Sequence, residues 1–168
     1  MTCDNSFSLL TVNQFSLEFS KIVNTTTTLQ TCNLPTLSLP KVNVSTPFSK
    51  MQEPGDMLTF GDFNVSFKAD EHFKSYLDIF NWLNTLGFPK KHEQYSQGLL
   101  NSQRKNHVAD ATLTLLTNSS QPNISISYRN IFPVFLSDIN LTTIVTETEY
   151  INCQASFAYD YFEIEYLD

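Results

Sequence analysis

Residues 57–89 place a strand, a helix and a stop signal in direct succession, and this stretch restricts the fold more than any other. Phe63, Val65 and Phe67 alternate with polar residues, which is the period of a half-buried strand. We therefore expect a strand over residues 58–67, with one face turned to a core.

A helix is predicted immediately after this strand, from Asp70 to Leu86. Asp70 is a good N-cap, and Glu71 adds negative charge in the first turn, where the helix dipole favours it. Gly87 and Pro89 are typical of a helix end.

This helix is apolar over more than the single stripe, about 100° wide, that a surface helix needs. Lys74, Asp78, Asn81 and Thr85 fill only a narrow polar arc. Two interpretations remain open: a helix deep in its own core, or one that also contacts another subunit. The candidates for helix packing or a subunit interface are Phe80, Ile79, Trp82 and Leu86.

Five further segments have strand patterns. Residues 13–22 alternate at Phe15, Leu17 and Phe19, and a Thr-rich stretch leads into a second strand near Cys32. Residues 111–117 and 123–129 flank the turn sequence NSSQPN and predict a hairpin. The last strand begins at Ile151, and its apolar phase switches at Tyr161–Phe162, which predicts a bulge or bend. Residues 130–140 are interpreted as a connection with a buried Phe132–Pro133 corner.

Residues 34–50 form a proline-rich segment that we interpret as an extended arm or edge segment. Pro35, Pro40 and Pro47 exclude a central strand, because proline cannot donate a backbone hydrogen bond. A loop containing the Pro54–Gly55 turn is expected to follow. The candidates in the arm for contact with a neighbouring subunit are Leu39, Val42 and Val44.

A second unusual segment, near residues 90–108, has no periodicity and is interpreted as a mobile loop that touches a neighbouring subunit. It contains much of the chain's positive charge, at Lys90, Lys91, Arg104 and Lys105. The rest of residues 1–168 contains no linker and no repeat, so we expect a single domain.

Net charge is −7 and the isoelectric point is near 4.8, which disfavours a nucleic-acid-binding module that needs clustered Lys and Arg. The three cysteines lack CxxC spacing, and we expect them to be reduced, with Cys153 buried in a strand. No segment approaches the roughly 20 apolar residues that span a bilayer, so no membrane insertion is expected.

No catalytic motif is present, and we expect neither an enzyme nor a cofactor or metal site. His72, His92 and His107 are scattered along the chain, and capping explains the adjacent Asp70 and Glu71 without catalysis. From the residues alone, the chain is an antiparallel β domain with one amphipathic helix.

The sequence also resembles the tail-tube-fold proteins of tailed bacteriophages, of the type found in T4-like and marine myoviruses. The resemblance is carried by the arm CNLPTLSLPKVNVSTPF, the strand–helix stretch that begins PGDMLTF, the hairpin that begins DATLTLL, and the ending YINCQASFAYDYFEIE. Together these segments span most of the chain from Cys32 to Glu165.

This resemblance implies a mainly β structural protein, an antiparallel β-sandwich or barrel with one flanking α-helix. Proteins of this family assemble into rings, usually hexameric, that form the tail tube, its baseplate initiator or its neck terminator. The resemblance implies as partners other copies of the chain, neighbouring tail, baseplate or neck proteins, a sheath where one exists, and DNA that passes without specific adhesion. It also implies a place in the virion tail after synthesis in the host bacterial cytoplasm, with Asp160 and Glu163 as candidates for lining the channel.

Two other classes of function remain as alternatives. A β-barrel module for a small ligand or carbohydrate would require an apolar internal cavity. A hydrolase or metal enzyme would require the histidines to converge with Cys or carboxylates.

Overall fold

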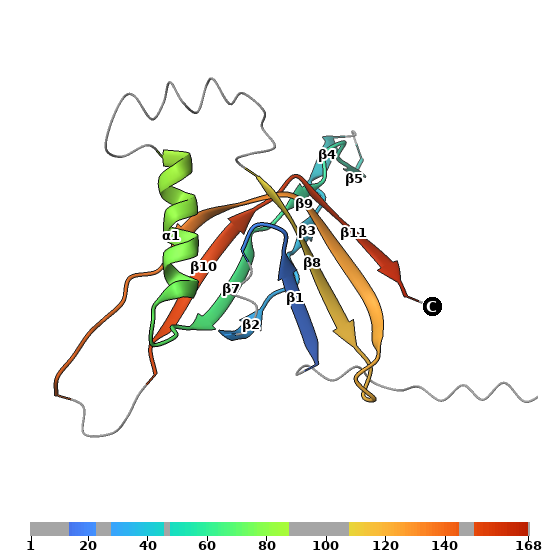
Figure 1. Cartoon of the computed structure of the whole chain (residues 1–168). Coiled ribbons are helices and arrows are strands. Elements are labelled where there is room, and N and C mark those ends of the chain that lie inside the picture. Colours follow the sequence, from blue (N-terminus) through green and yellow to red (C-terminus); the bar gives the residue numbers. More distant parts are fainter. Residues whose placement is uncertain (1–13, 23–27, 46–47, 88–107, 145–149, 168) are drawn as a thin grey trace, which may run out of the picture.

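The computed structural model describes residues 14–22, 28–45, 48–87, 108–144 and 150–167, and these form strands flanked on one side by a helix (Figure 1). The helix is α1 (Lys74–Gly87). The strands are β1 (Phe15–Phe19), β2 (Leu29–Cys32), β3 (Leu37–Ser38), β4 (Lys41–Ser45), β5 (Lys50–Pro54), β6 (Thr59–Phe60), β7 (Phe63–Lys68), β8 (Ala109–Leu116), β9 (Pro122–Leu136), β10 (Asn152–Ala158) and β11 (Tyr161–Tyr166).

Seven of these strands form one antiparallel sheet, in the order β1-β8-β9-β10-β7-β2, with β11 also paired to β9. The 15-residue β9 is shared by two groups of strands: its first half pairs with β8 and β11, and its second half pairs with β10. In Figure 1, β9 arches over the molecule and the two groups lie on either side of the core. This arrangement confirms the expected antiparallel β fold with a flanking helix.

The prediction that residues 130–140 form a connection is wrong, because β9 continues to Leu136. Asn130 has a positive φ of 55°, and this bend lets one strand change partners without ending. Pro133 is tolerated because its partner Phe157 stands at a register shift, where the missing N–H interrupts no regular ladder.

The core is built from the strand faces that the alternation predicted. Phe63, Val65 and Phe67 of β7 are buried, and so are Cys153 and the other core-facing residues of β10. A series of aromatic rings runs from the helix to the part of the core beneath the first half of β9. Its members are Trp82, Phe157, Phe63, Tyr128 and Tyr159, with neighbouring ring centroids 4.6–6.4 Å apart. These contacts join the two groups of strands into one apolar interior.

The helix begins at Lys74, four residues later than predicted. Residues 70–73 form a turn, in which the Phe73 N–H donates to the Asp70 carbonyl and Phe73 has a positive φ of 60°. Asp70 nevertheless caps the helix, because its Oδ1 accepts a hydrogen bond from the Ser75 N–H at 3.2 Å. The cap was predicted correctly, while the turn that separates it from the helix was missed.

Two segments that were each predicted as one strand are divided in the structure. The strand expected over residues 58–67 is β6 and β7, which belong to different sheets, and the last strand expected from Ile151 is β10 and β11. Strand β1 and the β8–β9 hairpin lie where the sequence placed them, whereas the bulge or bend predicted at Tyr161–Phe162 is a break that ends β10 at Ala158 and starts β11 at Tyr161. The loop expected around Pro54 is instead strand β5, which pairs with β4 over five residue pairs. Residues 88–107 and Cys3 lie outside the described residues, so the loop near 90–108 stays a prediction.

Candidate functional site

The four-stranded sheet, formed by β1, β8, the first half of β9 and β11, presents an ordered polar outer face. Its residues form rows across the strands, set by the antiparallel registers. One row contains Glu163, Ser127, Thr112 and Glu18, and the next contains Glu165, Ser125, Thr114 and Ser16. Hydroxyl groups therefore occupy the middle of this face, and carboxylates lie towards its two edges.

Both edges of the four-stranded sheet are free within the described part of the chain: β1 pairs only with β8, and β11 only with β9. Neighbouring strands alternate in direction, so in a sheet of four strands the two edges run in opposite directions. Neither edge strand contains the lysine or proline with which proteins commonly block edge pairing. Two such edges can pair with each other antiparallel when they belong to different copies.

The core-facing side of β11 is incompletely covered. Ile164 is paired with the buried Ile126, but Ile164 itself is 52% exposed and Tyr166 is 78% exposed. Exposed apolar side chains on this face are typical of a surface that contacts another protein chain along the β11 edge.

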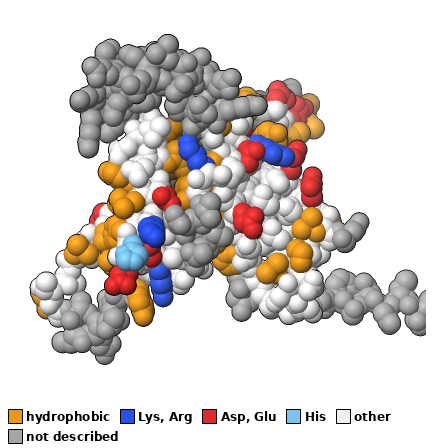
Figure 2. All heavy atoms as spheres, in the orientation of Figure 1, with side chains coloured by type: hydrophobic (Ala, Val, Ile, Leu, Met, Phe, Trp, Pro, Cys, Tyr) orange, Lys and Arg blue, Asp and Glu red, His pale blue; other side chains and the backbone are white. Residues whose placement is uncertain are grey.

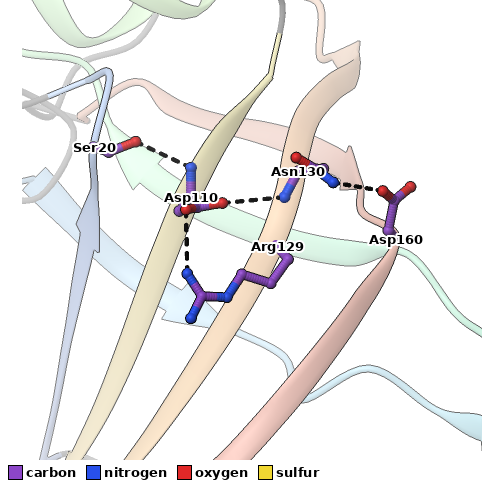
Figure 3. Close-up of polar contacts among 5 residues, drawn as sticks. All are labelled: Ser20, Asp110, Arg129, Asn130 and Asp160. Carbon is purple, nitrogen blue, oxygen red and sulfur yellow. Dashed lines mark hydrogen bonds and ion pairs between the residues drawn. The ribbon is translucent and has the colours of Figure 1, made fainter. Parts of the chain in front are cut away.

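Asp160, a predicted channel residue, lies at the bend of β9 in a network of polar contacts (Figure 3). Its Oδ2 accepts a hydrogen bond from Asn130 Nδ2 at 2.6 Å, while the Asn130 N–H donates to Asp110 Oδ1 at 3.2 Å. Asp110 Oδ2 lies 3.3 Å from Arg129 Nη1, and the Asp110 N–H donates to Ser20 Oγ at 3.0 Å.

This network ties the ends of β1 and β8 to the β9 bend and to the turn between β10 and β11. It therefore gives Asp160 a structural role, and it holds the guanidinium of Arg129 beside a carboxylate. Glu163 differs from Asp160, because it lies on the outer face in the row described above. Channel lining by either residue stays a prediction.

Helix α1 carries two apolar stripes on nearly opposite sides, at about 100° per residue. The inner stripe contains Ser75, Ile79, Trp82 and Leu86; the first three are buried, and Leu86 packs against the core. The outer stripe contains the exposed Leu77 and Phe80 and the half-buried Tyr76, which also packs against the core. Phe73, in the turn before the helix, places its ring beside that of Tyr76 and extends this stripe.

Among the four helix candidates, Ile79, Trp82 and Leu86 thus serve packing within the chain, and Phe80 is 44% exposed. Leu77, which the sequence analysis did not select, is 45% exposed beside it. The missed signal was the angular separation of the two stripes, which can be read from the spacing of the apolar residues.

The segment Lys41–Pro54, called the hairpin arm from here on, is formed by β4 and β5, and all residues of both strands are exposed. Cross-strand pairs lie on the same face, so the register separates its side chains. One face holds Val42, Val44, Met51 and Glu53; the other holds Lys41, Asn43, Ser45, Lys50, Gln52 and Pro54. The predicted arm residues Val42 and Val44 therefore share an apolar face, and Leu39 lies exposed just before it.

The base of the hairpin arm is closed by a tight backbone approach. The Gly55 N–H donates to the Pro40 carbonyl at 2.7 Å, and a Cβ at Gly55 would stand 2.7 Å from the same oxygen. Beyond this point β3 and β6 pair, which connects the arm to the body. Figure 2 shows hydrophobic side chains over the helix at the left and over the arm at the upper right.

A hollow of about 250 Å³ on β2, β7 and β10 bears on the ligand-binding alternative. It is open to solvent, and its lining is mostly polar, with Thr31, Asn33, Asn64, Ser66, Gln154 and Ser156. It is therefore not the enclosed apolar cavity that this alternative requires.

Two thiols and one tyrosine hydroxyl in or beside the core have raised pKa values and are neutral at pH 7. Burial raises the pKa of the half-buried Cys32 thiol to about 11 and also raises the pKa of Cys153 and of Tyr128. No cluster of three or more His, Cys, Asp or Glu suited to a metal ion occurs among the described residues, which include His72 but not His92 or His107. Within the same residues, no helix has the length and hydropathy of a membrane span.

Known proteins resemble this chain in structure rather than in sequence. No protein-family model matches it, and no curated protein matches it. A chain from the tube-terminating cap of the anti-feeding prophage superposes with a TM-score of 0.67 at 10% identity, covering 99% of this chain and 100% of that chain.

Two chains from the PVC extracellular contractile injection system are similar to the same degree. One, from the sheath/tube terminator, has a TM-score of 0.67 at 14% identity and covers 95% of this chain and 99% of its own. The other, from the sheath–tube complex, has a TM-score of 0.66 at 12% identity, and the match covers 95% of this chain and 93% of that chain. The chain described here therefore has a tail-tube-like fold.

Proposed function

We propose that this chain is a non-enzymatic structural subunit of the tail of a bacteriophage or of a related contractile injection particle. It forms the tube or one of the rings that begin or end the tube, at the baseplate or at the neck. Support comes from its fold, which matches chains of tube-terminating and sheath–tube assemblies over nearly the whole length.

The observation that carries this proposal is that the two edges of the four-stranded sheet run in opposite directions and that no further described strand pairs with either of them. In the assembly, β11 of one copy pairs antiparallel with β1 of the next, and repetition closes a ring, which we expect to be hexameric. Each junction is the same heterologous contact, and such contacts close into rings when the rotation between copies allows it. The junction also covers the exposed apolar side of β11, including Ile164 and Tyr166.

The outer face of the four-stranded sheet lines the channel in this arrangement. Its rows of Ser and Thr offer weak neutral contacts, and Glu18, Glu163 and Glu165 repel a polyanion. Arg129 on the same strands is paired with Asp110. A genome passes such a surface without adhering, since phosphate binding depends on clustered positive charge.

The proposal is tested by the oligomeric state of the purified full-length protein. We expect rings by negative-stain electron microscopy and a multimeric mass by light scattering. Ile164→Lys places a charge on the apolar side of β11 and should yield monomers with unchanged circular dichroism, because this side chain is half exposed in the single chain.

Ile144→Lys is the matched control, because Ile144 is also an exposed isoleucine but lies outside both edge strands. It should retain the rings. A wild-type protein that stays monomeric at high concentration, or rings that persist in Ile164→Lys, would overturn the proposal.

A further inference from the structure

We infer that the apolar face of the hairpin arm packs on the outer stripe of helix α1 in a second copy of this chain. This inference rests on the proposed function, and it names the surfaces that join neighbouring copies beside the sheet junction. Both surfaces are present in every copy, so each copy gives an arm to one neighbour and receives an arm from another.

The hairpin arm needs a surface that the described part of its own chain does not provide. An isolated two-stranded hairpin is marginally stable in water, and among the described residues β4 and β5 pair with no other strand. Its side chains are nevertheless sorted into an apolar face with Val42, Val44 and Met51 and a polar face with Lys41 and Lys50. Such sorting stabilises a hairpin only where the apolar face is covered.

The outer stripe of α1 offers a surface of the matching kind. Leu77 and Phe80 are each nearly half exposed, and the rings of Phe73 and Tyr76 lie 5.1 Å apart beside them. Residues 73–80 therefore combine aliphatic and aromatic side chains over roughly 11 Å, which covers part of the roughly 17 Å length of each five-residue strand of the arm.

The arm and the helix cannot meet within one copy, because they lie on opposite sides of the molecule (Figure 1). The contact must therefore join two copies, and in the proposed ring it is heterologous, like the junction between β11 and β1. Two separate surfaces that join the same pair of neighbours make a ring more stable than either surface alone.

The position of each surface relative to the sheet edges favours a second copy over a different partner. The arm adjoins β11: Phe60 of β6, at the base of the arm, places its ring 5.8 Å from that of Phe162 in β11. The helix adjoins β1: Lys21, two residues after this strand, places Nζ 5.0 Å from the Trp82 ring. Pairing β11 of one copy with β1 of the next therefore brings the arm and the neighbouring helix to the same junction.

Charge at the two surfaces is complementary. Glu53 is the one charged residue on the apolar face of the hairpin arm, and Lys74 borders the outer stripe of α1 beside Leu77. In the docked arrangement a Glu53–Lys74 pair lies at the rim of an apolar contact, where it sets the register between copies.

The test uses the full-length protein and measures the concentration at which half of it is assembled. Val44→Asp and Leu77→Asp should each raise this concentration by at least about tenfold, the effect of one disrupted apolar anchor. Asn43→Asp introduces the same charge on the polar face of the same strand and should leave assembly unchanged.

A charge exchange tests the pairing directly. Glu53→Lys and Lys74→Glu should each weaken assembly, and the double variant should recover it, whereas surfaces with unrelated partners would show additive losses. Circular dichroism and melting of the monomer, expected to be unchanged, exclude misfolding as the cause.

The possible results separate this inference from the proposed function. Suppose that the wild-type protein forms rings and Ile164→Lys is monomeric, while Val44→Asp and Leu77→Asp assemble like the wild type. The docking of the arm is then wrong, and the sheet junction stands. If Val44→Asp weakens assembly and Leu77→Asp does not, the arm has another partner surface, and the inference fails. A wild-type chain that remains monomeric would contradict both.

Discussion

Strands β7 and β4 have nearly the same apolar alternation, but they lie in opposite environments. Phe63, Val65 and Phe67 of β7 are almost completely buried, whereas Val42 and Val44 of β4 are 53% and 37% exposed. The alternation determines which face of a strand is apolar. It does not determine whether that face is covered by the same chain or by another.

The difference comes from the neighbours of each strand. Strand β7 lies between β2 and β10, and its apolar face meets the aromatic core. Strand β4, which follows Pro40, pairs with β5 alone among the described residues, and every residue of these two strands is exposed. The body, meaning the seven-stranded sheet with α1, therefore buries its apolar area within the chain, whereas the apolar area of the hairpin arm is left exposed.

The largest effect that distinguishes the body from the arm is expected in the core. Phe157→Ala should lower the free energy of unfolding of the monomer by about 3–5 kcal/mol, because it removes a ring that contacts three others. These are the rings of Phe19, Phe63 and Trp82. Chemical denaturation followed by circular dichroism measures the change.

Met51→Ala is the counterpart in the arm, since Met51 is apolar and more than half exposed. The unfolding free energy of the monomer should change by less than about 0.5 kcal/mol. A loss comparable to that of Phe157→Ala would show that the arm packs on its own chain.

An intermediate effect should separate the two stripes of helix α1. Ile79→Ala should lower the free energy of unfolding by about 2–4 kcal/mol, since this fully buried side chain leaves a cavity. Phe80→Ala, one residue further on the other stripe, should cost the monomer under about 1 kcal/mol and should weaken assembly instead. Equal losses in the two monomers would remove the distinction between an inner and an outer stripe.

The smallest expected effect is a loss of thermal stability in alkaline solution that arises in the body. The pKa of Cys32 is raised by burial to about 11, from an ordinary value of 9.0. The folded state therefore keeps its proton longer than the unfolded state, so the stabilisation is complete below about pH 9 and is lost as the pH rises towards 11.

Melting temperatures of the monomer between about pH 8 and pH 11 should fall in this way, and Cys32→Ser should reduce the fall. Tyr128 contributes in the same direction, because burial raises its pKa as well. A melting temperature that rises over this interval would contradict the assigned burial.

Most of the strand faces could be predicted because side-chain alternation is a local property. Phe63, Cys153 and Leu17 were assigned to apolar faces from the sequence, and all three are buried. The switch at Tyr161 was also visible, since a change of phase requires a bulge or a break. The resemblance to tail-tube proteins, carried by these same segments, agrees with the fold.

The candidate site was predicted less completely than the fold. Phe80, Val42 and Val44 are exposed apolar residues as an interface requires, but Ile79 and Trp82 lie in the core. Burial on a two-striped helix depends on which stripe meets the sheet, and composition is nearly the same on both.

The sequence by itself determined the helix, the cap at Asp70, most of the strand segments and the apolar face of those strands, because these follow from backbone preferences and short-range periodicity. Only the tertiary structure decided that β9 continues through Asn130 and Pro133, since a strand changes partners only when other strands stand on both sides of its bend. It also decided that the outer stripe of the helix and the apolar face of the arm are left uncovered. Exposure belongs to the packed molecule, because a side chain is buried only by residues that the fold brings to it.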